Sequence, residues 1–252
     1  MLSKDKLDFW QDNGYLVVDD VFSPEEISQL ITYTHDIENL VETPEKWMIY
    51  YEKSRLDQSK ILGRTEYFLD YHPECKALIM SDRLTGMISA LLGQEAILFK
   101  EKINFKLAGS NGYPAHQDAP AWQNFIPQKF ISSFIAIDQM TLENGCLYVL
   151  PKRHKEGLIA DNLLADDNPD WVPIAMKTGE VLFFDAYMPH KSSGNFSKNS
   201  RRTLILTHSP KADGDQRDEY FSRKRLSFPP EIERAVRIPA TDNQFNYFNP
   251  FN

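Results

Sequence analysis

The chain has 252 residues, 42% of them hydrophobic and 12% aromatic, so it is long enough to bury a sizeable core. Its formal net charge of −8 argues against a nucleic-acid partner, which requires a basic surface. No apolar run approaches the roughly 20 residues of a membrane span, and the charged start of the chain lacks the apolar segment of a signal peptide. Cys75 and Cys146 belong to no C-x-x-C motif and are expected to be buried free thiols. We therefore expect a cytoplasmic protein with no membrane partner, and nothing in the sequence indicates its oligomeric state.

The first 95 residues are predicted to be mainly helical. Ser3 can cap a helix over 4–12 that ends at Gly14, and a short strand follows at 15–18. The segment Ser23-Pro-Glu-Glu predicts a second helix, because it combines a serine cap, a proline in the first turn and a capping box. Apolar residues at helical spacing predict a further helix from near residue 81 to 93.

From about residue 96 the apolar period changes from 3.6 to 2, which predicts strands. In the first of them, apolar Ile97, Phe99, Ile103 and Phe105 alternate with other residues, most of them polar. Further strands are predicted at 134–139, 147–150, 181–185 and 203–208, and 155–178 is interpreted as an inserted surface loop. Short strands separated by turns indicate an all-β core with packed helices, which is a double-stranded β-helix, or jelly roll, of the cupin-like type.

We expect a single domain over residues 1–252. It would consist of a helical N-terminal part (1–95), a jelly-roll core (about 96–210) and a C-terminal tail (211–252). The tail is polar at its start and aromatic at 245–251, so it is expected to close over the site or to cover a sheet edge.

The motif His116-Gln-Asp118 is the first candidate for metal binding. Two residues at this spacing on an extended segment point to the same side, so both can reach one ion. The motif also follows a strand and a turn-rich stretch, and sites are commonly built where strands end in loops. His154-Lys-Glu156 has the same pattern, but it lies in a basic turn that we expect to be exposed.

His190, which follows the apolar strand at 181–185, is the predicted third ligand. Two histidines and one carboxylate on one face of an octahedron are the ligand set of non-haem iron(II) oxygenases. Arg201 follows eleven residues later with Thr203 on the same strand face, and a guanidinium beside a hydroxyl can hold a carboxylate. Arg202 is then expected to point outward.

These features together resemble the phytanoyl-CoA dioxygenase family of Fe(II)/2-oxoglutarate oxygenases. The resemblance rests on the histidine and aspartate motif, the stretch from His190 to Asn195, Arg201-Arg-Thr203 and the opening from Phe9 to Asp19. It covers residues 5 to about 208. Lys191 and Ala108 depart from residues that are frequent in the family, and neither departure affects the metal assignment.

The resemblance implies that His116, Asp118 and His190 bind Fe(II), with 2-oxoglutarate and dioxygen as co-substrates. Arg201, with Thr203 nearby, is then implied to hold the distal carboxylate of 2-oxoglutarate. Because halogenating relatives have Gly or Ala in place of the aspartate, the resemblance implies a hydroxylase.

Several other residues are assigned through the same resemblance. Asn104 matches a co-substrate contact of ectoine-hydroxylase-like members, and Lys100 on the same strand face is a further candidate. The alternative for this face is exposure to solvent. Trp122 resembles an aromatic residue that borders the active site, with a place in the core as its alternative.

The substrate is expected to be a small polar molecule. In length and in its N-terminal and HQD-A-P-A-W segments the chain is most similar to the 2-aminoethylphosphonate dioxygenase-like members, which hydroxylate the carbon next to phosphorus. A phosphonate requires cations and amides, and an ammonium group requires an aromatic face or a carboxylate. The candidates for the phosphonate are Arg64, Lys102, Asn124 and Gln139, and those for the ammonium group are Trp122, Tyr67 and Asp138.

Three other functions remain open from the sequence. The first is a hydroxylase of an amino acid or of an osmolyte such as ectoine. The second is a metal-binding jelly roll without enzymatic activity, which would have no need of Arg201 and Thr203. The third is a zinc hydrolase with the same ligands, for which no general base stands out in the sequence.

Overall fold

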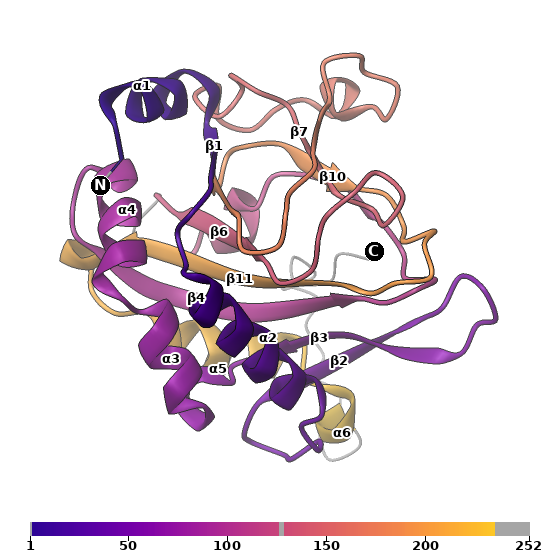
Figure 1. Ribbon diagram of the computed structural model, residues 1–252. Helices are drawn as coiled ribbons and strands as arrows, with labels where there is room; N and C mark the ends of the chain where they lie inside the picture. The colour runs from indigo at the N-terminus through magenta and orange to yellow at the C-terminus, as the bar shows by residue number, and fades with distance from the viewer. Residues whose placement is uncertain (1, 126–128, 235–252) are drawn as a thin grey trace.

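The computed structural model describes residues 2–125 and 129–234, which form two antiparallel β-sheets flanked by helices (Figure 1). The large sheet has the order β1 (Tyr15–Val18), β9 (Val181–Asp185), β6 (Ile131–Ala136), β11 (Arg201–Pro210), β4 (Ala96–Lys106), β3 (Lys60–Glu66) and β2 (Met48–Lys53). The small sheet has the order β5 (Tyr113–His116), β10 (His190–Ser192), β7 (Leu147–Val149) and β8 (Val172–Ile174). This arrangement confirms the predicted jelly roll with packed helices.

The two faces of the large sheet are covered differently (Figure 1). One face packs against α2 (Pro24–Glu38), α3 (Pro73–Ile79) and α4 (Asp82–Leu92), and this layer contains the largest cluster of buried apolar side chains. The small sheet lies against the other face, where a second apolar cluster fills the space between the sheets. The site must therefore be built on the face that turns away from these three helices.

The predicted helix ends are confirmed. In α1 (Lys4–Asn13) the Ser3 hydroxyl accepts a hydrogen bond from the amide of Lys6, and Gly14 ends the helix with φ 75°. A side chain at Gly14 would also collide with the ring of His154, because an added Cβ would lie 2.4 Å from it. In α2 the Ser23 hydroxyl and the Glu26 carboxylate form the predicted capping box.

The N-terminal part is less helical than predicted. Residues 1–95 also contain the hairpin β2–β3, which pairs with β4 over Lys102–Asn104 and extends the large sheet. The hairpin carries charged and tyrosine side chains at most positions, so its apolar alternation is weak. The predicted loop at 155–178 likewise contains strand β8.

The predicted alternation in β4 fails at Phe99. The pairing partner of Thr207 is Lys100 whereas that of His208 is Leu98, so Phe99 forms a β-bulge. Leu98 therefore packs in the layer below the helices, and Phe99 packs on the other face. The polar face of β4 is not exposed to solvent, because Lys100, Asn104 and Lys106 are all buried.

The tail contains a helix that packs on β4. We call the face of the large sheet that is turned away from α2, α3 and α4 the inner face. The helix α5 (Arg217–Ser227) covers the part of this face that the small sheet leaves open, and α6 (Glu231–Arg234) follows it. Tyr220 and Phe221 of α5 join Phe99 in a third apolar cluster. The aromatic segment 245–251 lies outside the described residues.

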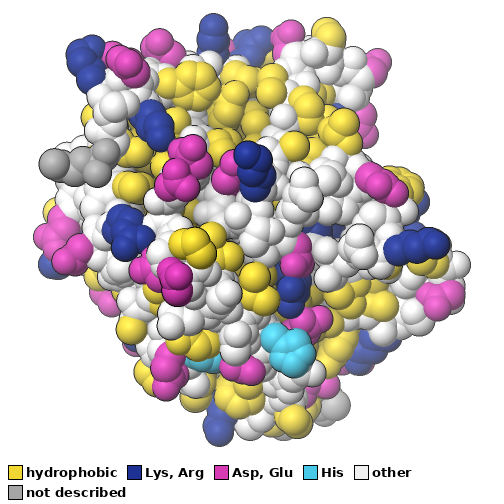
Figure 2. All heavy atoms as spheres, in the orientation of Figure 1, with side chains coloured by type: hydrophobic (Ala, Val, Ile, Leu, Met, Phe, Trp, Pro, Cys, Tyr) yellow, Lys and Arg dark blue, Asp and Glu magenta, His cyan; other side chains and the backbone are white. Residues whose placement is uncertain are grey.

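The surface in the view of Figure 2 carries side chains of both charges. On this face, Lys and Arg side chains are mixed with Asp and Glu, and hydrophobic side chains gather near α1 and β1. Within the described part of the chain, no helix has the length and apolarity to cross a membrane.

Two of the serine caps, Ser23 and Ser81, provide a test of the capping interaction. Ser23→Ala removes the hydroxyl that accepts from the Glu26 amide at 3.2 Å, so we expect the free energy of unfolding to fall by about 0.5–2 kcal/mol. Ser81 caps α4 without a side-chain hydrogen bond, and Ser81→Ala should change it by less than about 0.5 kcal/mol. Urea unfolding measures both values, and equal losses would contradict the capping role.

Candidate metal centre

His116 and His190 are brought together by strand pairing. β5 and β10 are antiparallel, and their register places His116 directly opposite His190. The ring centroids are 4.2 Å apart. Residues paired in this way project to the same face of a sheet, so both imidazoles point toward the large sheet at the mouth of the jelly roll.

The hydrogen bonds of the two rings leave Nε2 available for a metal. Nδ1 of His116 lies 2.7 Å from the carbonyl oxygen of Pro114, and Nδ1 of His190 lies 3.0 Å from that of Met188. A carbonyl accepts only from a protonated nitrogen, so in the neutral ring Nε2 keeps its lone pair. Burial and the adjacent His116 lower the pKa of His190 to about 4, which keeps this ring neutral at pH 7.

Asp118 completes the group just beyond the end of β5. One of its carboxylate oxygens lies 3.7 Å from Nε2 of His116. The possible ligand atoms of Asp118 and both histidines all lie within 4.8 Å of one another. Burial alone would raise the pKa of Asp118, but His190, Lys100 and His116 lower it below its ordinary value. The carboxylate is thus ionised, as metal binding requires.

A small cavity of about 40 Å³ lies behind this triad, between the two sheets. Arg201 lines it and is 3% exposed. Its Nη1 donates to the hydroxyl of Thr203 at 3.1 Å, while its Nε has no partner among the described residues. The side-chain oxygen of Asn104, which lines the same cavity, is also buried without a partner there.

A larger pocket of about 570 Å³ lies on the outer side of the triad. It shares Lys100, Lys102, Tyr113 and two triad residues, His116 and Asp118, with the inner cavity. Arg64 and Trp122 also line it, and its outer rim is formed by Leu158, Ile159, Asp161 and Leu164. The triad therefore stands at the junction of an inner and an outer compartment.

The comparisons with known proteins agree with this geometry. The profile of the phytanoyl-CoA dioxygenase family matches residues 10–203. The chain belongs to this family. The predicted class of enzyme, a dioxygenase, is thereby confirmed.

Two of its relatives have names that refer to phosphonates. A methylphosphonate hydroxylase from Gimesia maris is 40% identical over 90% of this chain and 88% of its own. A 2-aminoethylphosphonate dioxygenase from the uncultured bacterium HF130_AEPn_1 is 34% identical over 96% of this chain and 95% of its own. The crystal structure of EctD from S. alaskensis with 2-oxoglutarate and 5-hydroxyectoine has a TM-score of 0.73 at 21% identity, covering 84% of this chain and 77% of that one. This likeness confirms the fold.

Two predicted substrate residues of the dioxygenase lie away from both compartments. Asn124 is exposed, and its backbone oxygen accepts from Arg223. Gln139 is also exposed, because β6 ends at Ala136 and Gln139 lies in the turn beyond it. Neither residue is among those that line the two compartments.

The groups predicted to receive an ammonium ion already contact cations of the protein. Asp138 pairs with Arg202 at 2.8 Å, which confirms that Arg202 points away from Arg201. The Arg217 guanidinium lies 4.9 Å from the ring centroid of Tyr67, and the Lys100 ammonium lies 4.4 Å from that of Trp122. Of these three groups, only Trp122 lines the outer pocket.

Gln117, between two members of the triad, was missed by the sequence reasoning. Its amide nitrogen donates to the carbonyls of Gly157 and Tyr187 at 2.8 and 2.6 Å, and its amide oxygen accepts from the backbone of Ile159 at 2.9 Å. One side chain thus fixes the rim of the outer pocket to the metal-binding segment.

The second histidine motif does not form a metal site. The ring of His154 packs against Gly14, and Glu156 pairs instead with Arg153 at 2.9 Å. Neither residue belongs to a group of potential ligands among the described residues.

This contrast gives a matched pair of variants. Asp118→Ala removes a charged ligand. Loss of a residue that only hydrogen-bonds to a ligand lowers metal affinity about 10–100-fold, so we expect the loss of the ligand itself to lower the affinity for Fe(II) by more than roughly a hundredfold. Glu156→Ala removes the carboxylate of the other motif and should leave the affinity unchanged. Anaerobic calorimetric titration with Fe(II) measures both, and similar losses would argue against the triad.

Proposed function

We propose that this dioxygenase is an Fe(II)- and 2-oxoglutarate-dependent hydroxylase of a small phosphonate. The first candidate substrate is 2-aminoethylphosphonate, hydroxylated at the carbon bonded to phosphorus, and the second is methylphosphonate. The names of the two phosphonate-related relatives support both candidates. The observation that carries the proposal is a buried guanidinium, Arg201, in a small cavity directly behind a two-histidine, one-carboxylate triad.

His116, Asp118 and His190 would hold the iron. Imidazole nitrogen and carboxylate oxygen are the donors that suit non-haem Fe(II), and three protein ligands leave positions for co-substrates. The hydrogen bonds from both Nδ1 atoms to backbone carbonyls orient the rings and fix their tautomers.

Arg201 would hold the distal carboxylate of 2-oxoglutarate in the inner cavity. Burial lowers the pKa of its guanidinium to about 10, so it is still charged at pH 7. A buried charge without an ion pair is costly, and an incoming carboxylate removes that cost. The unpartnered Nε of Arg201 and the oxygen of Asn104 are polar atoms that a ligand can satisfy, directly or through water.

When bound, iron and 2-oxoglutarate activate dioxygen for insertion of one oxygen atom into a C–H bond of the substrate. The residues of this chain bind and orient the reactants. Lys102 and Arg64 would contact the phosphonate oxygens from the floor of the outer pocket, where both are found. Trp122 and the rim held by Gln117 would exclude water from the reacting carbon.

The unpaired thiols Cys75 and Cys146 are both buried, which supports a reducing compartment such as the cytoplasm.

Two adjacent arginines allow the co-substrate site to be tested. Arg201→Met should weaken 2-oxoglutarate binding by roughly tenfold to a hundredfold, because a charge-assisted pair is lost. Arg202→Met removes a cation that pairs outward with Asp138 and should leave binding unchanged. Anaerobic titration of the Fe(II) protein, followed by the visible charge-transfer band, gives both dissociation constants.

The substrate class is tested by turnover. Wild-type protein with Fe(II) and 2-oxoglutarate should release succinate in the presence of 2-aminoethylphosphonate or methylphosphonate, but not with ectoine or free amino acids. Turnover of ectoine alone would replace the phosphonate assignment and keep the reaction class. Absence of the charge-transfer band in the wild-type protein would refute the reaction class itself.

A further inference from the structure

Helix α5 forms a wall of the outer pocket. Tyr220 and Lys224 are one turn apart on the same helical face, they are 1% and 4% exposed, and both line the pocket. Neither residue was predicted from the sequence to belong to the site. The tail thus contributes directly to the compartment that we assign to the substrate.

The ammonium group of Lys224 lies in a cluster of opposite charges. It pairs with one oxygen of Glu66, and Nε of Arg64 bonds the other oxygen of the same carboxylate at 2.7 Å. Lys102 stands directly across from Glu66 in the register of β3 and β4. Burial alone would raise the pKa of Glu66, but Lys224 and Arg64 lower it to about 2, so the carboxylate is ionised.

Cations are in excess around the pocket. Four cationic side chains line it: Arg64, Lys100, Lys102 and Lys224. Of the three lining carboxylates, Asp118 belongs to the metal triad and Asp161 is exposed on the rim. Glu66 and Asp118 therefore face four cationic side chains, and Asp118 is reserved for the metal, so a bound anion would find favourable partners here. A tetrahedral oxyanion offers three oxygens to cations that converge from β3, β4 and α5.

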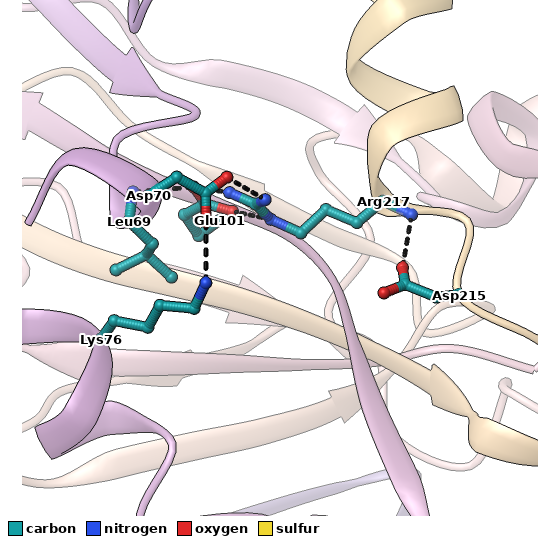
Figure 3. A network of polar contacts seen from close by, with 6 residues as sticks. All are labelled: Leu69, Asp70, Lys76, Glu101, Asp215 and Arg217. Carbon is teal, nitrogen blue, oxygen red and sulfur yellow. Dashed lines mark hydrogen bonds and ion pairs between the residues drawn. The ribbon is translucent and has the colours of Figure 1, made fainter. Parts of the chain in front are cut away.

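Arg217 fixes the start of α5 (Figure 3). Its Nε and Nη2 donate to the two oxygens of Glu101 at 2.9 and 2.7 Å, and Nη1 donates to Asp70 at 2.7 Å. Asp70 is held in turn by Lys76, while Glu101 also accepts from the amide of Leu69. Glu101 lies in β4 between Lys100 and Lys102. The pairing of Arg217 with Glu101 therefore fixes the position of α5 relative to the strand that carries these two lysines.

The spacing along the helix links this pairing to the pocket. Arg217 and Lys224 are seven residues, or about two turns, apart, so they project from nearly the same face. The bidentate pair of Arg217 with Glu101 fixes the orientation of the guanidinium as well as its distance from the carboxylate. The rotation of α5 that Arg217 imposes thus sets where the Lys224 ammonium lies.

We propose that α5 is the substrate-recognition helix: Lys224, together with Arg64 and Lys102, contacts the phosphonate oxygens, and Arg217 is the positioning residue for Lys224. This inference rests on the proposed function, because it assumes that the outer pocket receives the substrate.

Lys224→Met tests the direct contact. The methionine side chain has a length similar to that of lysine but no charge. The KM for the phosphonate should therefore rise roughly tenfold to a hundredfold. We expect kcat and the charge-transfer band of the Fe(II)–2-oxoglutarate complex to change little. Lys224→Arg should restore most of the loss. Lys211→Met is the control, since Lys211 is an exposed tail residue that pairs with Glu95.

A second variant guards against misfolding. Glu66→Gln combined with Lys224→Met removes both charges of the buried pair, so it avoids an uncompensated carboxylate. It should show the same rise in KM. An unchanged KM in a folded Lys224 variant would overturn the inference and leave the proposed function intact.

Arg217→Lys tests positioning, because lysine loses the bidentate geometry. The KM should rise about three- to tenfold at unchanged kcat. Since Arg217 acts through Lys224, the double variant Arg217→Lys/Lys224→Met should be no worse than Lys224→Met alone. Additive losses would show that Arg217 has a merely structural role and would overturn this part.

The proposed substrate class and the role of Lys224 can be refuted by different results. Perturbation of the charge-transfer band by methylphosphonate or 2-aminoethylphosphonate, without oxygen, reports substrate binding in the absence of turnover. If the band forms in the wild-type protein but neither phosphonate perturbs it or is turned over, the substrate class and the role of Lys224 are both refuted. If a phosphonate binds equally well to wild type and to Lys224→Met, only the role of Lys224 is refuted.

Discussion

Burial of positive charge on the inner face of the large sheet is the constraint on which the rest of this structure depends. Arg201, Lys100 and Lys102 all lie between the two sheets or beneath the outer pocket, where water cannot solvate them fully. Burial lowers the pKa of Lys100 to about 7, which shows how unfavourable its charged form is without a ligand. A buried cation of this kind is stabilised by a carboxylate partner or a bound anion, and otherwise it loses its proton.

The register of the strands places several buried polar and charged residues on one face of the large sheet. Thr203, Asn104 and Arg64 occupy one row across β11, β4 and β3, and Lys102 with Glu66 continues in the next row. Residues in one row project to the same face, so polar groups far apart in the sequence line one surface. The bulge at Phe99 interrupts the alternation just before Lys100, which sends Phe99 toward Trp122 on the same inner face.

The sequence predicts best what depends on local spacing. His116 and Asp118 are two residues apart, and the helix starts at Ser3 and Ser23 follow from adjacent residues. The extent of the large sheet and the pocket walls depend instead on which segments meet in space. Gln139 lies outside both compartments because β6 ends three residues earlier, and Lys224 was missed because its partner Glu66 lies 158 positions away.

The net acidic charge of the chain has little influence on the basic pocket. Exposed carboxylates act through water and ions, which screen them over about 8–10 Å at physiological ionic strength, so the net charge of −8 has little effect inside the pocket. Lys102 and Lys224 act at contact distance in a less polar medium, where the attraction of an anion is stronger. The acidic composition therefore does not weaken the recognition of an anionic substrate, because the site depends on a few cations that the fold buries together.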